Sequence, residues 1–170
     1  IQTQNLFVFD TETDSLDTLT TKFAGVSFAV KENEAFFVAL NPSSGSEALF
    51  STNITDRLEP GTFVEIFKPG FENKEIRKVC QNGKFDIAVL RTYGINVENF
   101  YFDTMIASYV IDPDQKHGMD ELAQRFLNYE TIPLSDLIGN KKNADKIFEV
   151  DLNLLSNYSC EDADITYRLY

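Results

Sequence analysis

The first forty residues alternate between short apolar runs and polar breaks. The runs at Leu6–Phe9, Phe23–Val30 and Glu34–Leu40 are rich in Phe, Val and Ala, a composition typical of buried β-strands. Only a short polar link, KENE, separates the second run from the third, which is typical of a hairpin. We therefore predict three consecutive strands, with the second and third paired as a hairpin.

The rest of the chain mixes helix and strand patterns. Asn41–Gly61 is rich in turn-forming residues and has no assigned role. The segments expected after it are a short helix at Thr62–Phe67 ended by Pro69 and Gly70, a strand at Ile76–Gln81, a helix after Asn82, a strand at Asn99–Asp103, a helix from Thr104, and mainly helix beyond Gly118. This order predicts one α/β domain over residues 1–170, with a mixed central sheet flanked by helices.

Composition narrows the class of protein. A chain of 170 residues that is 43% hydrophobic can form one ordinary core, and no apolar run approaches the roughly 20 residues of a membrane span. We expect a soluble domain that was cut from a longer protein, since the chain starts with Ile and has no signal-type N-terminus. Cys80 and Cys160 lack metal-type spacing, so we expect a reducing compartment and a core position for both.

The net charge of -12 argues against broad, non-specific binding to nucleic-acid phosphates. A nucleic-acid partner would have to be held locally or through metal ions.

Two carboxylates follow the first apolar run directly. Asp10 and Glu12 are two residues apart, so in an extended strand their side chains project from the same face. The same spacing occurs at Glu32/Glu34 and Asp162/Asp164, so spacing alone does not distinguish a site. What distinguishes this pair is its place at the end of a buried strand, where repulsion and lost hydration are costs that a divalent cation offsets. The pattern indicates a metal site.

Two further segments have both a structural and a functional interpretation. Asn82 and Asp86 follow a predicted strand. Asn82 can cap the helix that begins there, and the negative charge of Asp86 can interact favourably with the positive end of the helix dipole. Tyr158 and Asp162 are four residues apart, so they share one helix face, as a core Tyr beside a solvated Asp also would.

Taken together and in order, Asp10-x-Glu12, Asn82-x-x-Phe85-Asp86 and Tyr158-x-x-x-Asp162 resemble the three motifs of the DEDDy exonucleases. More narrowly, FDTETDSLD, FDTM, MDELA and CEDADIT resemble the 3′-5′ proofreading exonuclease domain of bacterial DNA polymerase I, family A. The resemblance covers nearly the whole chain. It implies a ribonuclease H-like fold and hydrolysis of DNA from the 3′ end to nucleoside 5′-monophosphates with two divalent cations, Mg²⁺ or Mn²⁺.

The resemblance also implies roles for individual residues. Asp10, Glu12 and Asp162 would hold the metal ion that activates the attacking water, Asp10 would bridge to a second ion held by Asp86, and Tyr158 would orient the water. The implied substrate contacts are Thr11, Thr13, Leu16, Asn82, Phe85 and Leu134, with Leu16 acting as a wedge between terminal bases. For Leu16 and Leu134, ordinary core packing is the alternative.

The implied partners are a single-stranded 3′ end of DNA and the polymerase domain of the same longer chain, without a membrane. We expect the isolated domain to be monomeric and its location to be the bacterial cytoplasm, near the nucleoid. His117 is interpreted as a loop residue rather than a base, and Asp103 as the cap of the helix that starts at Thr104.

Other classes of protein are alternatives to a DEDDy exonuclease. A Rossmann nucleotide-binding domain is disfavoured because no G-x-G-x-x-G follows the first strand. A haloacid-dehalogenase-like phosphotransferase would have the motif Asp-x-Asp after its first strand, whereas here the residue two positions after Asp10 is Glu12. A non-catalytic scaffold of the polymerase and a ribonuclease D-like RNA exonuclease remain open as alternatives.

Overall fold

A computed structural model gives the structure of the chain, and it describes residues 1–42, 56–139 and 141–170. Most of Asn41–Gly61, the stretch rich in turn residues, lies outside the described residues. Among the described helices, none is long and apolar enough to cross a bilayer.

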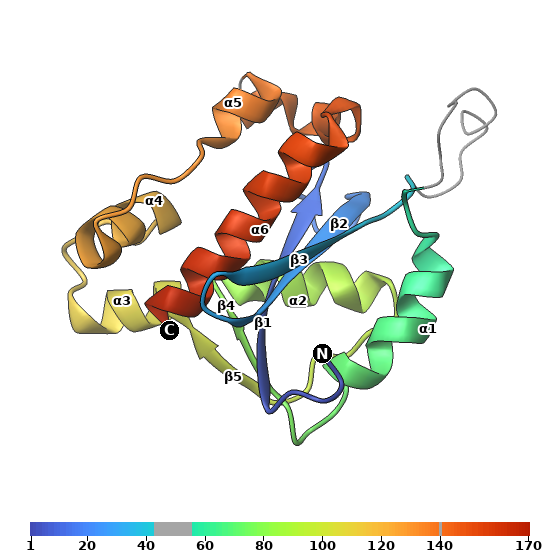
Figure 1. Cartoon of the computed structure of the whole chain (residues 1–170), viewed down its shortest axis with the longest axis horizontal. Coiled ribbons are helices and arrows are strands. Elements are labelled where there is room, and N and C mark those ends of the chain that lie inside the picture. The colour runs from blue at the N-terminus through green and yellow to red at the C-terminus, as the bar shows by residue number, and fades with distance from the viewer. Residues whose placement is uncertain (43–55, 140) are drawn as a thin grey trace.

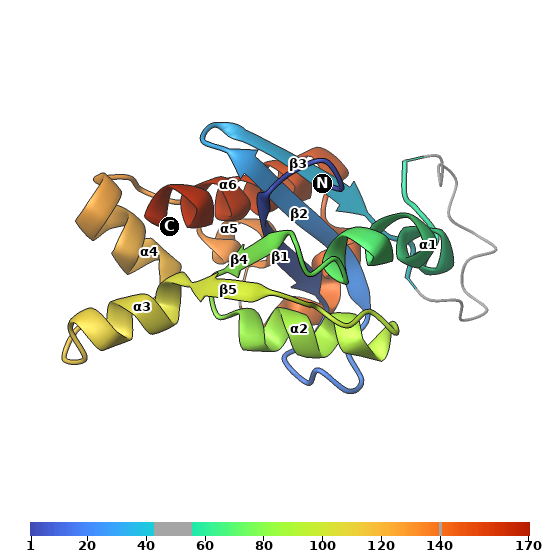
Figure 2. The same ribbon diagram turned by 90° about the horizontal axis from the view of Figure 1, so that it is seen from below.

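A five-stranded sheet forms the centre of the fold, with the strand order β3-β2-β1-β4-β5 (Figures 1 and 2). β1 pairs with β2 and β2 with β3 in antiparallel fashion, whereas β1–β4 and β4–β5 are parallel, so the predicted mixed sheet and hairpin are confirmed. The strands are β1 (Leu6–Thr13), β2 (Phe23–Lys31), β3 (Glu34–Ala39), β4 (Arg77–Cys80) and β5 (Phe100–Asp103).

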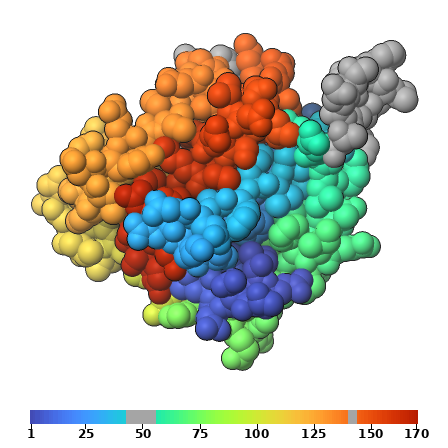
Figure 3. All heavy atoms as spheres, in the orientation of Figure 1, coloured from blue at the N-terminus to red at the C-terminus, as the bar shows by residue number. Residues whose placement is uncertain are grey.

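Helices cover both faces of the sheet. They are α1 (Pro60–Phe71), α2 (Gly83–Thr92), α3 (Thr104–Ile111), α4 (Met119–Leu122), the π-helix η1 (Ala123–Leu127), α5 (Leu134–Ile138), the 3₁₀ helix η2 (Lys141–Glu149) and α6 (Leu152–Leu169). α6 lies over one face of the sheet, and α1 and α2 lie over the other (Figures 1 and 2). In the space-filling view, α6 crosses its face beside the β2–β3 hairpin (Figure 3).

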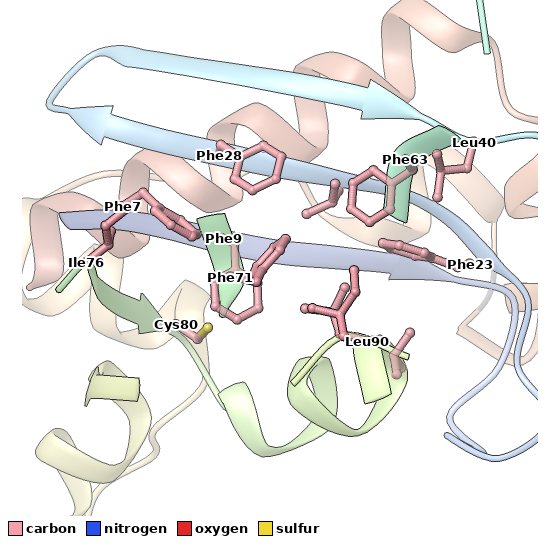
Figure 4. Packing of buried hydrophobic residues seen from close by; sticks show 13 residues of the cluster. Phe7, Phe9, Phe23, Phe28, Leu40, Phe63, Phe71, Ile76, Cys80 and Leu90 are labelled. Carbon is pink, nitrogen blue, oxygen red and sulfur yellow. The ribbon is translucent and has the colours of Figure 1, made fainter. Parts of the chain in front are cut away.

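The alternation of side chains along β1 separates the two faces. Phe7 and Phe9 point into an aromatic core with α1 and α2, where Phe71 packs edge-on against both rings (Figure 4). Val8 points to the opposite face and packs against Ala163 of α6. Because successive side chains alternate in a strand, Asp10 and Glu12 belong to the α6 face and Thr11 to the α2 face.

Two predicted elements, the first strand and the first helix, extend further than expected. β1 does not end at Phe9 but continues to Thr13, so Asp10 and Glu12 lie within the strand and pair with Ser27 and Gly25 of β2. The pairing with β2 supplies backbone hydrogen bonds that the polar side chains alone did not suggest.

α1 runs from Pro60 to Phe71 rather than from Thr62 to Phe67, and it passes through Pro69 and Gly70. Proline removes only one N–H group, and the fully buried Phe71 holds the last turn against the sheet. Gly70 permits this turn to approach the N-terminus, because a Cβ there would lie 2.8 Å from Cδ1 of Ile1.

The cysteine prediction is confirmed for one residue only. Both cysteines are free; Cys80 is buried but Cys160 is only half-buried.

Replacing Phe71 with Ala should lower the free energy of unfolding by about 3–5 kcal/mol, because the side chain is fully buried among Phe7, Phe9 and Phe28. Phe36→Ala is the matched control, since Phe36 is 54% exposed and should cost much less. Urea unfolding of both variants checks this, and equal losses would contradict the assigned core.

Candidate active site

Three carboxylates converge where α6 crosses β1. Asp10 and Glu12 of β1 and Asp162 of α6 each offer one oxygen atom, and these three atoms lie within 4.8 Å of one another. Asp162 reaches this position because its neighbour Ala163 packs on Val8 of β1. The cluster therefore depends on the contact between one strand and one helix that are far apart in the sequence.

Asp86 approaches the cluster from the other side of β1. β4 pairs with β1 only as far as Val8, so the backbone of β1 beyond that point lacks a strand neighbour on this edge. Asp86 occupies the edge instead: its Oδ1 atom accepts hydrogen bonds from the Thr11 backbone N–H at 3.1 Å and from the Thr11 hydroxyl at 2.6 Å. The first turn of α2 thus bonds to β1 where the pairing with β4 has ended, and it fixes a fourth carboxylate beside the other three.

Burial and mutual repulsion make these four acids hard to ionise together. Loss of hydration, with the nearby charge of Asp86, raises the pKa of Asp10 well above its ordinary value. Burial in the same way raises the pKa of Glu12 to about 7 and that of Asp86 to about 7, and it raises the pKa of Asp162 well above 3.8.

The cluster has the donor set of a divalent-cation site. Oε1 of Glu12 is buried and has no hydrogen-bond partner in the structure, which leaves this oxygen free to bind a ligand. Hard carboxylate oxygens are the ligands that Mg²⁺ and Mn²⁺ prefer, and a cation would offset the repulsion among the acids. The residues present therefore fit the metal ions that the sequence motifs imply.

Tyr158 lies one helical turn before Asp162 on α6. Burial and the negative charges of Asp162, Glu12 and Asp10 raise the pKa of the Tyr158 hydroxyl well above its ordinary value. The phenol therefore stays protonated at neutral pH, so it can donate a hydrogen bond but cannot act as a base.

Thr11 and Thr13 use their hydroxyls within the protein. Thr11 is buried and gives both its hydroxyl and its N–H to Asp86, and the Thr13 hydroxyl donates to the carbonyl of Ser15 at 3.0 Å. The sequence motif implied a substrate contact for Thr11 and gave no indication of its hydrogen bonds to Asp86. The two-residue period of β1 could have indicated them, because it turns Thr11 away from Asp10 and Glu12.

Leu16 is the most exposed of the predicted apolar contacts. It is 87% exposed, so core packing does not explain it. The loop that carries it is held by side-chain bonds: Asp14 accepts from the N–H of Lys22 at 2.7 Å, and Asp17 accepts from the N–H of Leu19 at 3.1 Å. The loop therefore presents an apolar side chain to solvent at the end of the strand that carries the acids.

The other predicted contacts differ in their surroundings. Asn82 is exposed in a left-handed conformation with φ of 60°, and its side chain does not cap α2, so the capping interpretation is wrong. Phe85 packs against the main aromatic core, and Leu134 packs against a smaller cluster that contains Leu155. Packing is thus observed for these two apolar residues, and their contact with substrate stays a prediction.

The two residues interpreted structurally lie as expected. Asp103 accepts hydrogen bonds from the N–H groups of Met105 and Ile106, which confirms it as the cap of α3. His117 lies in the loop between α3 and α4, where its Nδ1 atom is 3.0 Å from the Ser108 hydroxyl.

The whole chain, residues 1–170, matches a family model described as a 3′-5′ exonuclease. The chain belongs to the 3′-5′ exonuclease family of DNA polymerase I. It is 37% identical over 161 residues to DNA polymerase I of Borreliella burgdorferi, and 34% identical over 173 residues to DNA polymerase I of Pseudomonas aeruginosa. These alignments cover 95% and 100% of this chain but only 16% and 18% of the relatives. The chain thus spans less than a fifth of the length of these polymerases.

A solved structure supports the fold. Brucella melitensis NrnC superposes with a TM-score of 0.69 over 99% of this chain and 71% of its own, at 20% sequence identity. The mixed five-stranded sheet flanked by helices is accordingly a ribonuclease H-like fold, as the sequence motifs implied.

In metal-free buffer, the unfolding free energy should fall as the pH rises from about 4 to about 7. The folded protein binds the Asp86 proton more tightly than the unfolded chain, because the pKa of Asp86 is raised from 3.8 to about 7, so stability present at low pH is lost as this proton leaves. Asp86→Asn should remove on the order of 2–4 kcal/mol of this pH dependence.

Urea unfolding in EDTA at pH 5 and pH 8 measures the effect, with Asp151→Asn as the control because Asp151 is an exposed acid away from the cluster. If Asp86→Asn and the wild type lose stability in parallel between the two pH values, the assigned burial of this carboxyl is wrong.

Proposed function

We propose that this chain hydrolyses the terminal phosphodiester at the 3′ end of DNA with two divalent cations and releases nucleoside 5′-monophosphates, as in proofreading during replication and repair. The observation that carries the proposal is the convergence of Asp10, Glu12 and Asp162 within 4.8 Å, with Asp86 anchored beside them by Thr11. Its family membership, as a 3′-5′ exonuclease, supports the same reaction.

Four carboxylates would hold the cations. Asp10, Glu12 and Asp162 would bind one, and Asp10 and Asp86 would bind the second. Bound cations supply an activated water and stabilise the negative charge that develops on phosphate and leaving-group oxygens. Mg²⁺ and Mn²⁺ both suit this oxygen donor set.

The protein's own contribution is to place these groups before the substrate arrives. β1 holds two acids in a strand whose neighbours are buried, and Thr11 fixes Asp86 through two hydrogen bonds, so little reorganisation is needed during the reaction. Tyr158 keeps its proton and donates a hydrogen bond, which orients a water rather than deprotonating it.

The substrate is proposed to be a single-stranded 3′ end. Leu16 stands exposed on the loop that follows β1, where an apolar side chain can insert between unstacked bases. The net charge of -12 means that the strand is held locally, through the cations and a few contacts, rather than by a broad basic surface.

A polymerase domain in the same longer chain is the proposed protein partner. The matched relatives are DNA polymerases I of which this chain covers less than a fifth. Four apolar residues of α3 are more than half exposed, and a packed neighbouring domain would bury them: Ile106, Tyr109, Val110 and Ile111. We further propose the bacterial cytoplasm, near the nucleoid, as the location, because the proposed substrate is there.

Asp10→Ala and Asp162→Ala should each abolish exonuclease activity, since each removes a ligand from the same cluster. The assay follows a 5′-labelled single-stranded DNA oligonucleotide with Mg²⁺, with Mn²⁺ and with EDTA. The wild type should give a metal-dependent ladder that shortens from the 3′ end. Asp114→Ala is the matched control, because Asp114 is an exposed acid of an acid-x-acid pair outside the cluster, and it should keep wild-type activity.

Alternative functions give different results in this assay. No cleavage in any metal would favour a non-catalytic scaffold, and faster cleavage of an RNA oligonucleotide of the same sequence would favour an RNA exonuclease. A normal rate in Asp10→Ala would overturn the site assignment.

Leu16→Ala should lower kcat/KM on single-stranded DNA by about fivefold, because an exposed apolar side chain that inserts between bases contributes on the order of 1 kcal/mol. Folding should be unaffected, since Leu16 contributes almost nothing to the core. Leu19→Ala is the control on the same loop, where Leu19 is 84% exposed, and it separates a specific contact from a general loss of apolar surface. An unchanged kcat/KM in Leu16→Ala would remove this residue from the substrate contacts.

A further inference from the structure

One carboxylate joins the beginnings of two helices. Asp103, the last residue of β5, is only 7% exposed. Its Oδ1 atom accepts hydrogen bonds from the N–H groups of Met105 at 2.9 Å and Ile106 at 3.2 Å, which start α3. The same side chain also accepts from the N–H groups of Asn82, at 3.1 Å to Oδ1, and Gly83, at 2.9 Å to Oδ2. A residue that caps its own helix therefore also holds the start of α2.

The N-terminal cap of α2 comes from Asp103 and not from the residue that precedes the helix. The residue that precedes it, Asn82, has a left-handed backbone and makes no side-chain cap. Asp103 is close enough to replace it because β4 and β5 are parallel and Cys80 pairs with Asp103 in the ladder. Gly83 lets the helix start approach this point, since a Cβ there would lie 2.7 Å from both Cβ of Cys80 and Cζ of Phe100.

The start of α2 determines where Asp86 lies. Asp86 is in the first turn of the helix, three residues after Gly83. On one side its Oδ1 atom is held by Thr11 of β1, and on the other the helix start is held by Asp103 of β5. Both oxygens of Asp103 are used by N–H groups, and Asp103 is not among the three acids whose oxygens converge, so it is not itself suited to be a ligand.

We propose that Asp103 is a positioning residue for the exonuclease reaction. Asp103 fixes the start of α2 relative to β5, so that Asp86 lies beside the carboxylates of β1. The inference rests on the proposed function, because Asp86 matters for metal binding only if the cluster binds metal. Asp103 acts through the backbone of α2 and touches neither metal nor substrate.

A single substitution separates the two capping roles. Serine is a good cap for its own helix, but its hydroxyl is too short to reach Asn82 and Gly83 across the strand pair. Asp103→Ser should therefore keep the start of α3 and release the start of α2. The matched control is Asp151→Ser, because Asp151 caps α6 through the N–H groups of Asn153 and Leu154 in the ordinary local way.

The first measurement is Mn²⁺ binding to the 170-residue chain by calorimetry. Wild type and Asp151→Ser should bind with equal affinities, and Asp103→Ser should bind about tenfold more weakly at one of two sites, as supporting residues of metal ligands commonly do. With single-stranded DNA in Mn²⁺, Asp103→Ser should lower kcat and leave KM nearly unchanged. A merely structural cap would lower the melting temperature without this split.

The second measurement tests the bonds in the wild type, so that the inference stays falsifiable if the variant does not fold. The amides of Asn82 and Gly83 should exchange slowly with deuterium, and rapid exchange of both would overturn the proposal. Unchanged Mn²⁺ affinities in folded Asp103→Ser would also overturn it, while leaving the proposed function intact. Failure of the wild type itself to bind Mn²⁺ would contradict the proposed function and the positioning role together.

Discussion

Repulsion among four carboxylates, three of them buried and Asp10 half-buried, is what the packing around β1 has to overcome. Asp10, Glu12, Asp86 and Asp162 are held with so little water that burial raises the pKa of each. Such an arrangement costs stability, and it persists only because the surrounding elements are fixed by other contacts. The aromatic core on one side of β1 (Figure 4) supplies that support together with the Val8–Ala163 contact on the other side.

β1 carries the site because it serves both faces of the sheet at once. Phe7 and Phe9 build the core with α1 and α2, and Val8 on the opposite face meets α6. β1 also extends beyond the end of its pairing with β4, so that part of the β1 edge is free to bond with Asp86. Because β1 continues beyond Phe9, Asp10 and Glu12 are held by pairing with β2 rather than carried on a loop.

Hydrogen bonds to backbone groups link the outer strands to this centre. Asp103 connects β5 with the start of α2, and Thr11 connects α2 with β1. The position of Asp86 on α2 is therefore fixed by contacts with two strands. Each bond is modest in energy, but the bonds of Thr11 to Asp86 and of Gly83 to Asp103 are buried, where an unmade bond is costly. Positional precision in the site therefore comes from a network rather than from any single contact.

The order of strands and helices, the hairpin, the cap at Asp103 and the three segments that carry the acids could be predicted from the sequence, because period, turn residues and motif spacing are local properties. The sequence did not indicate that β1 continues to Thr13 or that α1 passes through Pro69, because pairing with β2 and the burial of Phe71 override the local polar and proline signals. Nor did it distinguish exposed Leu16 from packed Phe85 and Leu134, since all three are simply apolar in the sequence. Only the tertiary structure decided that Thr11 holds Asp86 and that Asp103 serves a second helix, because these contacts join residues 75 and about 20 positions apart in the chain.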